Sequence, residues 1–215
     1  MSERWNPEGY AKTNIFEVLN MLNDPWFKSI LNNIILEKHD RVLEVGVGGG
    51  KFSALFAMFG CDVTMVDNNP AMLYTAQDNF PYFRFRTRLD DARTLVSIED
   101  NHYDIVFSDG LVEHFLDVNE RKNVVRNLYD KVAPEGVLIY SVPLKSSKDD
   151  EHQYETADEV MIEANGFLNT KNIACIKLES LKENHPVWVM VFVQKDFRKF
   201  KAQIFERMEN ETQPS

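Results

Sequence analysis

The stretch RVLEVGVGGGK, from Arg41 to Lys51, decides the fold. A short apolar run carries one acid, Glu44, and then breaks into glycine at positions 46, 48, 49 and 50. A helical pattern of apolar residues follows at once, from Phe52 to Phe59. This order predicts a buried strand, a turn where main chain approaches a ligand closely, and a helix whose free N–H groups face that ligand.

Strand and helix patterns alternate from that turn onward. We expect strands at 41–45, 62–66, 82–87, 103–108 and 137–142, a turn at Glu135-Gly136, and a helix over 156–165 that Gly166 stops. Two late apolar stretches, Ile173–Leu181 and Val187–Gln194, are too close in sequence for a crossover helix, so they predict an antiparallel hairpin. The pattern predicts an α/β, Rossmann-like, doubly wound fold: a seven-stranded, mostly parallel sheet with an antiparallel last strand.

The chain divides into three expected parts. Residues 1–40 form an N-terminal helical cap over the ligand site, 41–195 the ligand-binding domain, and 196–215 a C-terminal helix and tail. Pro25 opens the second helix of the cap. The cap has two possible roles: its helices cover the edge of the sheet, or Trp5 and Tyr10 close over a bound ligand.

Composition narrows the class of protein. The 215 residues carry a net charge of −10, which argues against a duplex nucleic-acid partner. No apolar run approaches the roughly 20 residues of a membrane span, and the N-terminus has no signal-peptide hydrophobic region. Cys61 and Cys175 lie in apolar contexts and are expected to be free thiols. We therefore expect a cytoplasmic protein.

The glycine turn does not fit the common phosphate-binding motifs. Its spacing is G-x-G-x-G, and a dinucleotide fingerprint would need glycine where Lys51 stands. A phosphate-binding P-loop would need Ser or Thr where Phe52 stands. The turn is therefore suited to a bulky ligand without pyrophosphate.

Acidic residues follow the next two strands. Asp67 comes 21 positions after Gly46, and a carboxylate there can accept hydrogen bonds from ribose hydroxyls. The alternative is a helix cap, a role that Asn68 or its neighbour could also fill. In Asp90-Asp91-Ala92 a carboxylate can accept from an exocyclic amine of adenine, and we favour Asp91; the alternative is a solvated acidic loop.

The fourth strand ends in an unusual cluster, SDGLVEHF, from Ser108 to Phe115. Glycine, glutamate, histidine and an aromatic residue follow a buried strand directly. His114 has either a proton-transfer role or a structural hydrogen bond near the site.

These segments resemble the class I S-adenosylmethionine-dependent methyltransferases, in particular the small-molecule branch. The resemblance rests on VLEVGVGGG, VDNNPAML, LDDA, YDIVFSDGLVEHF and KVAPEGVLIYSVP, and covers roughly Arg41 to Gln194. The last segment is usually written L-x-P-G-G; here Glu135 replaces the first glycine. The resemblance implies in-line transfer of the sulfonium methyl of S-adenosylmethionine to an O, N, S or C nucleophile, leaving S-adenosylhomocysteine.

The resemblance also implies roles for individual residues. Those expected to bind the cofactor are Glu44, Gly46, Gly48, Asp67, Asn68, Asp91, Ala92 and Ser108. Those expected to bind the acceptor are Tyr10, Glu113 and Tyr154, and His114 is the expected catalytic base if a base is used. No metal is expected, because Pro143-Leu144-Lys145 stands where catechol-type enzymes carry an acid.

The acceptor follows by elimination. The N-P-P-Y signature of enzymes that methylate amino groups on bases or glutamine is absent after the fourth strand, and so is the Pro-Cys motif of cytosine C5 methylation. With the net acidity, this leaves a small-molecule acceptor. The alternatives are a protein or RNA acceptor, a non-catalytic cofactor-binding partner protein, and a nucleotide-sugar or NAD enzyme. The sequence leaves the oligomeric state open.

Overall fold

The computed structural model describes residues 13–145, 153–170, 172–178 and 187–195. Its strands are β1 (Arg41–Val45), β2 (Asp62–Asp67), β3 (Arg86–Leu89), β4 (Tyr103–Asp109), β5 (Val132–Pro143), β6 (Ile173–Leu178) and β7 (Trp188–Gln194). They form one seven-stranded sheet in the order β3-β2-β1-β4-β5-β7-β6. The first five strands pair in parallel, and β7 is antiparallel to both β5 and β6. The predicted α/β fold and hairpin are confirmed.

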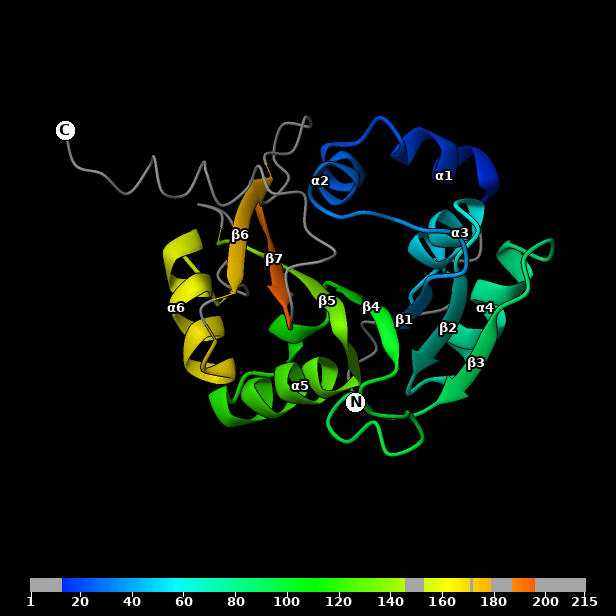
Figure 1. Cartoon of the computed structure of the whole chain (residues 1–215). Coiled ribbons are helices and arrows are strands. Elements are labelled where there is room, and N and C mark those ends of the chain that lie inside the picture. Colours follow the sequence, from blue (N-terminus) through cyan, green and yellow to red (C-terminus); the bar gives the residue numbers. More distant parts are fainter. Residues whose placement is uncertain (1–12, 146–152, 171, 179–186, 196–215) are drawn as a thin grey trace.

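The helices cover both faces of this sheet (Figure 1). They are α1 (Ile15–Met21), α2 (Pro25–Asn33), α3 (Lys51–Met58), α4 (Pro70–Asn79), α5 (Val118–Lys131), α6 (Ala157–Leu168) and the short 3-10 helix η2 (Val112–His114). Side chains of α1 to α4 share one apolar cluster with one face of the sheet. Side chains of α5 and α6 share a second cluster with the other face. The strand order reverses between β1 and β4, where ligands of such sheets bind.

Apolar side chains of the two N-terminal helices are part of the hydrophobic core on one face of the sheet. Asn14 caps α1, accepting from the N–H groups of the next turn, and Val18, Phe27 and Ile30 are fully buried in the first cluster. An ion pair of 2.8 Å between Glu17 and the Nζ of the first residue of α3 brings α1 beside the glycine turn. Trp5 and Tyr10 lie outside the described residues, so a cap over the ligand stays a prediction, as do the domain limits at residues 40 and 195.

The third strand lies later in the chain than its sequence predicts. β3 begins at Arg86 rather than at Tyr82, whose side chain is 93% exposed. The apolar alternation that suggested the strand is real, because Phe83 and Phe85 pack against the first cluster from an irregular segment. Pairing of Asp67 with Leu89 sets the register and brings the carboxyl ends of β2 and β3 together.

Two glycines have different roles from those predicted. Gly136 lies inside β5 at a bulge rather than in a turn, since Tyr103 pairs with Val132 and the next ladder pair is shifted. A Cβ at Gly136 would lie 2.7 Å from the carbonyl oxygen of Asp104, so the bulge requires glycine. Gly166 lies within α6 instead of ending it; Asn169, with a left-handed φ of 49°, ends the helix.

None of the helices among the described residues is both long and apolar enough to span a bilayer. Both cysteines are free thiols, as expected. Cys61 is buried at the start of β2, and Cys175 is half-buried in β6.

Candidate functional site

The glycine turn joins β1 to α3 through a left-handed main chain. Gly46, Gly48 and Gly50 have φ values of 79°, 49° and 78°. A Cβ at Gly50 would lie 2.8 Å from the Cβ of Ala76, so this glycine lets α3 pack closely on α4. A Cβ at Gly46 would lie 3.3 Å from a side-chain methyl of Leu111. Gly46 therefore faces the site, whereas Gly50 serves the packing of helices.

Asp67 connects the tip of β2 to this turn. One carboxylate oxygen accepts from the Val47 N–H at 3.2 Å and the other from the Asn69 N–H at 2.9 Å. Burial raises the pKa of Asp67, and these main-chain hydrogen bonds oppose that rise. Asn69 itself caps α4, accepting from Ala71 N at 3.0 Å. Asn69 is therefore the residue that caps the helix. Asp67 lines a cavity at the carboxyl ends of the strands, which is described below.

Asp90 and Asp91, which follow β3, both have partners within the protein. Asp91 pairs with Arg93 at 2.7 Å, and this hydrogen-bonded guanidinium lowers the pKa of the carboxyl. Asp90 accepts from the N–H and the hydroxyl of Ser97 at 2.7 and 2.6 Å. Asp90, Asp91 and Ala92 all line the same cavity, so the structure does not separate the two acids as candidates for reading adenine.

These segments meet in one cavity at the carboxyl ends of β1 and β2. Its walls are Val45, Gly46, Asp67, Asn68, Asp90, Asp91, Ala92, Leu111 and Phe115. The volume is about 60 Å³, whereas ligand pockets usually measure roughly 300–1,000 Å³. The cavity in this structure is therefore smaller than a nucleoside requires. Gly48, Glu44 and Ser108 were also predicted to bind the cofactor, but they do not line this cavity.

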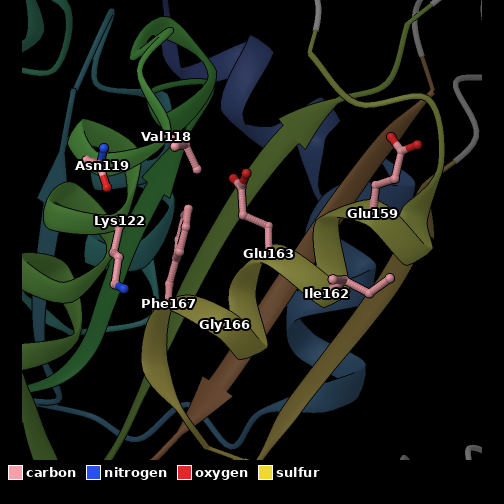
Figure 2. Close-up of a pocket in the computed structure, with 8 residues that line it drawn as sticks. All are labelled: Val118, Asn119, Lys122, Glu159, Ile162, Glu163, Gly166 and Phe167. Atoms are coloured by element: carbon pink, nitrogen blue, oxygen red, sulfur yellow. The ribbon is translucent and has the colours of Figure 1, made fainter.

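A larger hollow of about 480 Å³ lies between α5 and α6 (Figure 2). It is lined by Val118, Asn119 and Lys122 of α5 and by Glu159, Ile162, Glu163, Gly166 and Phe167 of α6. It is wide open to solvent, and none of the predicted site residues lines it. We assign the ligand site to the strand-end cavity, because size alone does not supply the converging polar groups of a binding site.

Two buried carboxyl groups, of Glu44 and Glu113, and the half-buried carboxyl group of Asp109 belong to β1, η2 and β4. Glu44, 2% exposed, accepts from the hydroxyl of Ser53, and burial together with the nearby charge of Asp109 raises its pKa to about 8. Burial raises the pKa of Asp109 to about 6, although the Ser141 hydroxyl donates to it. Burial and the charge of Asp109 raise the pKa of Glu113 to about 8. This concentration of perturbed acids is typical of a functional site.

Glu113 and His114 lie on η2, directly after β4. Their side chains approach to 4.0 Å between Oε1 and Nε2. The other oxygen of Glu113, and the hydroxyl of Ser108, are buried without a hydrogen-bond partner. The predicted residues of this motif are therefore brought together beside Phe115, which lines the cavity.

Tyr154, predicted to bind the acceptor, makes contacts within the protein. Its hydroxyl donates to Glu163 on α6, and Arg121 lies over its ring at 5.8 Å from the centroid. The side chain is buried. Contact with an acceptor therefore finds no support in this geometry. Tyr10, the other predicted aromatic contact, lies outside the described residues.

Three residues near the site were missed by sequence reasoning. Arg121 donates to the carbonyls of residues 115 and 116 at 3.0 and 2.9 Å, and Gln153 donates to that of Glu113 at 2.7 Å. Both hold the loop after β4. Trp188 begins β7 opposite Pro143, and because β7 is antiparallel its first residue lies at the carboxyl edge of β5. That topology was a usable signal, since the hairpin was predicted.

Comparison with known proteins agrees with this fold. Residues 43–140 match the family model described as "Methyltransferase domain". The ubiquinone biosynthesis O-methyltransferase of Rickettsia bellii is 25% identical over 153 residues, 67% of this chain and 58% of the relative. The trans-aconitate 2-methyltransferase of Delftia acidovorans is 28% identical over 141 residues, 65% of this chain and 49% of the relative. The chain thus matches about half the length of these relatives.

Solved structures share the fold. The N-methyltransferase NodS of Bradyrhizobium japonicum, in complex with S-adenosylhomocysteine, superposes with a TM-score of 0.61 at 13% identity, covering 85% of this chain and 89% of that one. A SAM-dependent methyltransferase of Aquifex aeolicus superposes with a TM-score of 0.62 at 15% identity, covering 88% and 100%. The fold is thus that of a Rossmann-like methyltransferase. Over residues 43–140 the chain is therefore similar to methyltransferases, and its fold is that of solved S-adenosylmethionine-dependent methyltransferases.

Proposed function

We propose that this protein transfers the methyl group of S-adenosylmethionine to a small-molecule acceptor. The observation that carries the proposal is the Asp67 carboxylate, held by Val47 N–H against the glycine turn and exposed to a cavity that also contains Asp91 and Ala92. A carboxylate in that position binds vicinal ribose hydroxyls, and an acid with adjacent main chain can read an adenine edge.

The residues present fit this cofactor. Gly46 lets main chain approach a ligand without a Cβ between them, and Asp67 keeps lone pairs beyond the two main-chain hydrogen bonds that it accepts. Glu44 lies behind the turn with a pKa near 8 and suits the positively charged amino-acid end of the cofactor, directly or by orienting neighbouring groups. Gly48 and Ser108 would contribute main chain and a hydroxyl there.

When bound, S-adenosylmethionine supplies an electrophilic methyl group on a sulfonium sulfur. The chain's own residues position the acceptor and exclude water: Leu111 and Phe115 cover the cavity. His114 lies beside it and is proposed to accept or relay the proton that the acceptor loses. Its side chain is partly exposed, so the proton can pass to solvent.

A small-molecule acceptor is supported by the names of the relatives, which describe methyl transfer to a ubiquinone precursor and to trans-aconitate. Free thiols at Cys61 and Cys175 suit a reducing compartment, so we place the reaction in the cytoplasm. Net acidity disfavours a nucleic-acid acceptor.

Isothermal titration tests the cofactor first. S-adenosylhomocysteine should bind at nanomolar to micromolar concentration, and NAD should not bind. Incubation of the protein with a metabolite pool and methyl-labelled cofactor then identifies the labelled acceptor. Binding without any labelled product would favour a non-catalytic partner protein, and label recovered in protein or RNA would overturn the small-molecule acceptor.

A further inference from the structure

A carboxylate and an indole ring face each other across Gly110, at the end of β4. This glycine has a φ of 62°, and a Cβ on it would lie 3.4 Å both from Glu113 Oε1 and from Trp188 Cη2. Asp109 precedes it in the chain and pairs with Ser141 on β5. Three side chains therefore lie close to Gly110: those of Glu113 on η2, Asp109 on β4 and Trp188 on β7.

His114, whose Nε2 lies 4.0 Å from Glu113 Oε1, is the basic side chain that the described residues pair with this group of acids. In the described parts of the chain, no lysine or arginine forms an ion pair with Glu44, Asp109 or Glu113. Glu113 is only 8% exposed, and its Oε2 has no hydrogen-bond partner. A buried oxygen of a carboxyl group that makes no hydrogen bond costs stability. Its retention at a strand end is therefore explained if a ligand supplies the partner.

The side chains around Gly110 indicate the chemical class of a ligand that could bond to the Glu113 carboxyl. Burial, with a smaller contribution from the charge of Asp109, raises the pKa of Glu113 to about 8. A cation bound beside this carboxyl would lower its pKa again and favour the carboxylate form. Aromatic faces such as that of Trp188 attract cations. Carboxylates and an indole together are the components of a site for an organic ammonium ion.

We propose that Asp109, Glu113 and Trp188 form a pocket that binds the positively charged amine of the methyl acceptor. This inference rests on the proposed function and names its acceptor class as amines.

Asp109 ends β4 and Glu113 follows it, two strand positions from β2, and the charge of Asp109 raises the pKa of Glu44. Saturating the protein with S-adenosylhomocysteine therefore has to separate binding of an acceptor amine from binding at the ammonium end of the cofactor. Glu44, next to the glycine turn, is the acid placed for that end.

The same groups give the amine a route to the neutral form, which has the lone pair needed for attack. The Glu113 carboxylate takes a proton from the ammonium ion: an N–H bond breaks, an O–H bond forms, and the electron pair stays on nitrogen. His114 Nε2, 4.0 Å from Glu113 Oε1, can pass that proton on to solvent.

A matched pair of probes tests the charge. The protein is saturated with S-adenosylhomocysteine and titrated by calorimetry with 2-phenylethylamine or with 2-phenylethanol, which has the same shape but no charge. We expect the amine to bind at least about tenfold more tightly, the effect of one charge-assisted hydrogen bond. Glu113→Gln should bring the two affinities together, whereas Glu155→Gln, on an exposed carboxyl paired with Lys145, should leave the preference intact.

Variants of Trp188 test the same pocket independently, in case Glu113→Gln does not fold. Trp188→Phe keeps an aromatic face and should retain most amine affinity, whereas Trp188→Leu should lose several-fold; thermal melts followed by circular dichroism show which variants are folded. The inference is overturned if the wild type binds both probes equally or neither in the millimolar range. It is also overturned if Glu113→Gln keeps the preference, or weakens S-adenosylhomocysteine binding as much as amine binding. Failure of the wild type to bind S-adenosylhomocysteine at all would instead refute the proposed function.

Discussion

Arg121 offers the sharpest test of how the loop after β4 is held. Its guanidinium, 7% exposed, donates to both carboxylate oxygens of Glu163 at 2.9 and 2.8 Å. It also donates to the carbonyls of Phe115 and Leu116. Arg121→Met keeps a long apolar stem and removes all four hydrogen bonds. The Glu163 carboxylate would then keep its hydrogen bond from Tyr154 but lose its cation.

The expected cost follows from burial. Removing one partner of a buried ion pair costs about 3–5 kcal/mol, because the other charge stays behind uncompensated. A domain of this size has roughly 5–15 kcal/mol of stability, so the variant should still fold. The control is Lys145→Met: Lys145 forms an exposed pair with Glu155 at 3.3 Å, and such pairs contribute at most about 1 kcal/mol.

Urea unfolding followed by circular dichroism measures both variants. The double variant Arg121→Met/Glu163→Met should lose less stability than the single one, since it leaves no unpaired carboxylate. Arg121→Met should also weaken S-adenosylhomocysteine binding, because Phe115 lines the cavity. A loss of stability no larger than that of Lys145→Met would refute the idea that this network holds the loop.

The remaining predictions address the turn, the acids and the proton. Asp67→Ala should weaken S-adenosylhomocysteine binding by about 1–3 kcal/mol, measured by calorimetry against Asp62→Ala at the opposite end of β2. Gly50→Ala should cost about 2–4 kcal/mol in urea unfolding, through left-handed strain and a 2.8 Å contact. Glu44 has a folded pKa of about 8, above its ordinary value, so unfolding free energy should fall as pH rises from 5 to 8, and Glu44→Gln should flatten that slope; an unchanged slope would exclude Glu44 as its source. His114→Ala should lower kcat about 10²- to 10⁴-fold with unchanged cofactor affinity; full activity would return His114 to a structural role.

Helix α6 contains a matched control for the glycine prediction. Gly166 lies inside the helix, and no atom lies within 4 Å of a Cβ built on it. Gly166→Ala should therefore stabilise the protein by about 0.5–1 kcal/mol. If alanine lowers the free energy of unfolding at Gly50 and raises it at Gly166, then packing requires the first glycine, whereas the helix only tolerates the second.

Local sequence patterns were sufficient for the parallel half of the sheet. Three of the first five predicted strands were placed closely, because buried parallel strands are continuous apolar runs bounded by turn residues. The fifth was found, but it begins at Val132, five residues before its predicted start. β3 was misplaced because an edge strand is half-exposed, and Phe83 and Phe85 imitate its alternation from an irregular segment. The Gly136 bulge and the interior Gly166 were read as stops, since glycine alone does not show whether a neighbouring backbone comes close.

The site was predictable where a residue follows its own strand. Asp67 comes directly after a predicted strand and Asp91 a few residues after the next one, and both line the strand-end cavity. His114 follows β4 on η2, and its role stays a prediction. Acceptor contact by Tyr154 stays a prediction; in the structure its hydroxyl donates to Glu163 on α6. The sequence did not reveal the pairing of Glu163 with Arg121, 42 residues apart, because such contacts depend on which helix lies beside which.

Trp188 shows how a predicted topology can locate a site residue on an antiparallel strand. Parallel strands bring their last residues to the ligand edge, but an antiparallel strand inserted among them brings its first. β7 begins at Trp188 opposite Pro143, the last residue of β5. The aromatic ring therefore reaches Gly110 and Glu113, far away in sequence. Under the proposed function, the cofactor would bind at the carboxyl ends of the parallel strands, and the first residue of the antiparallel strand would complete the acceptor side.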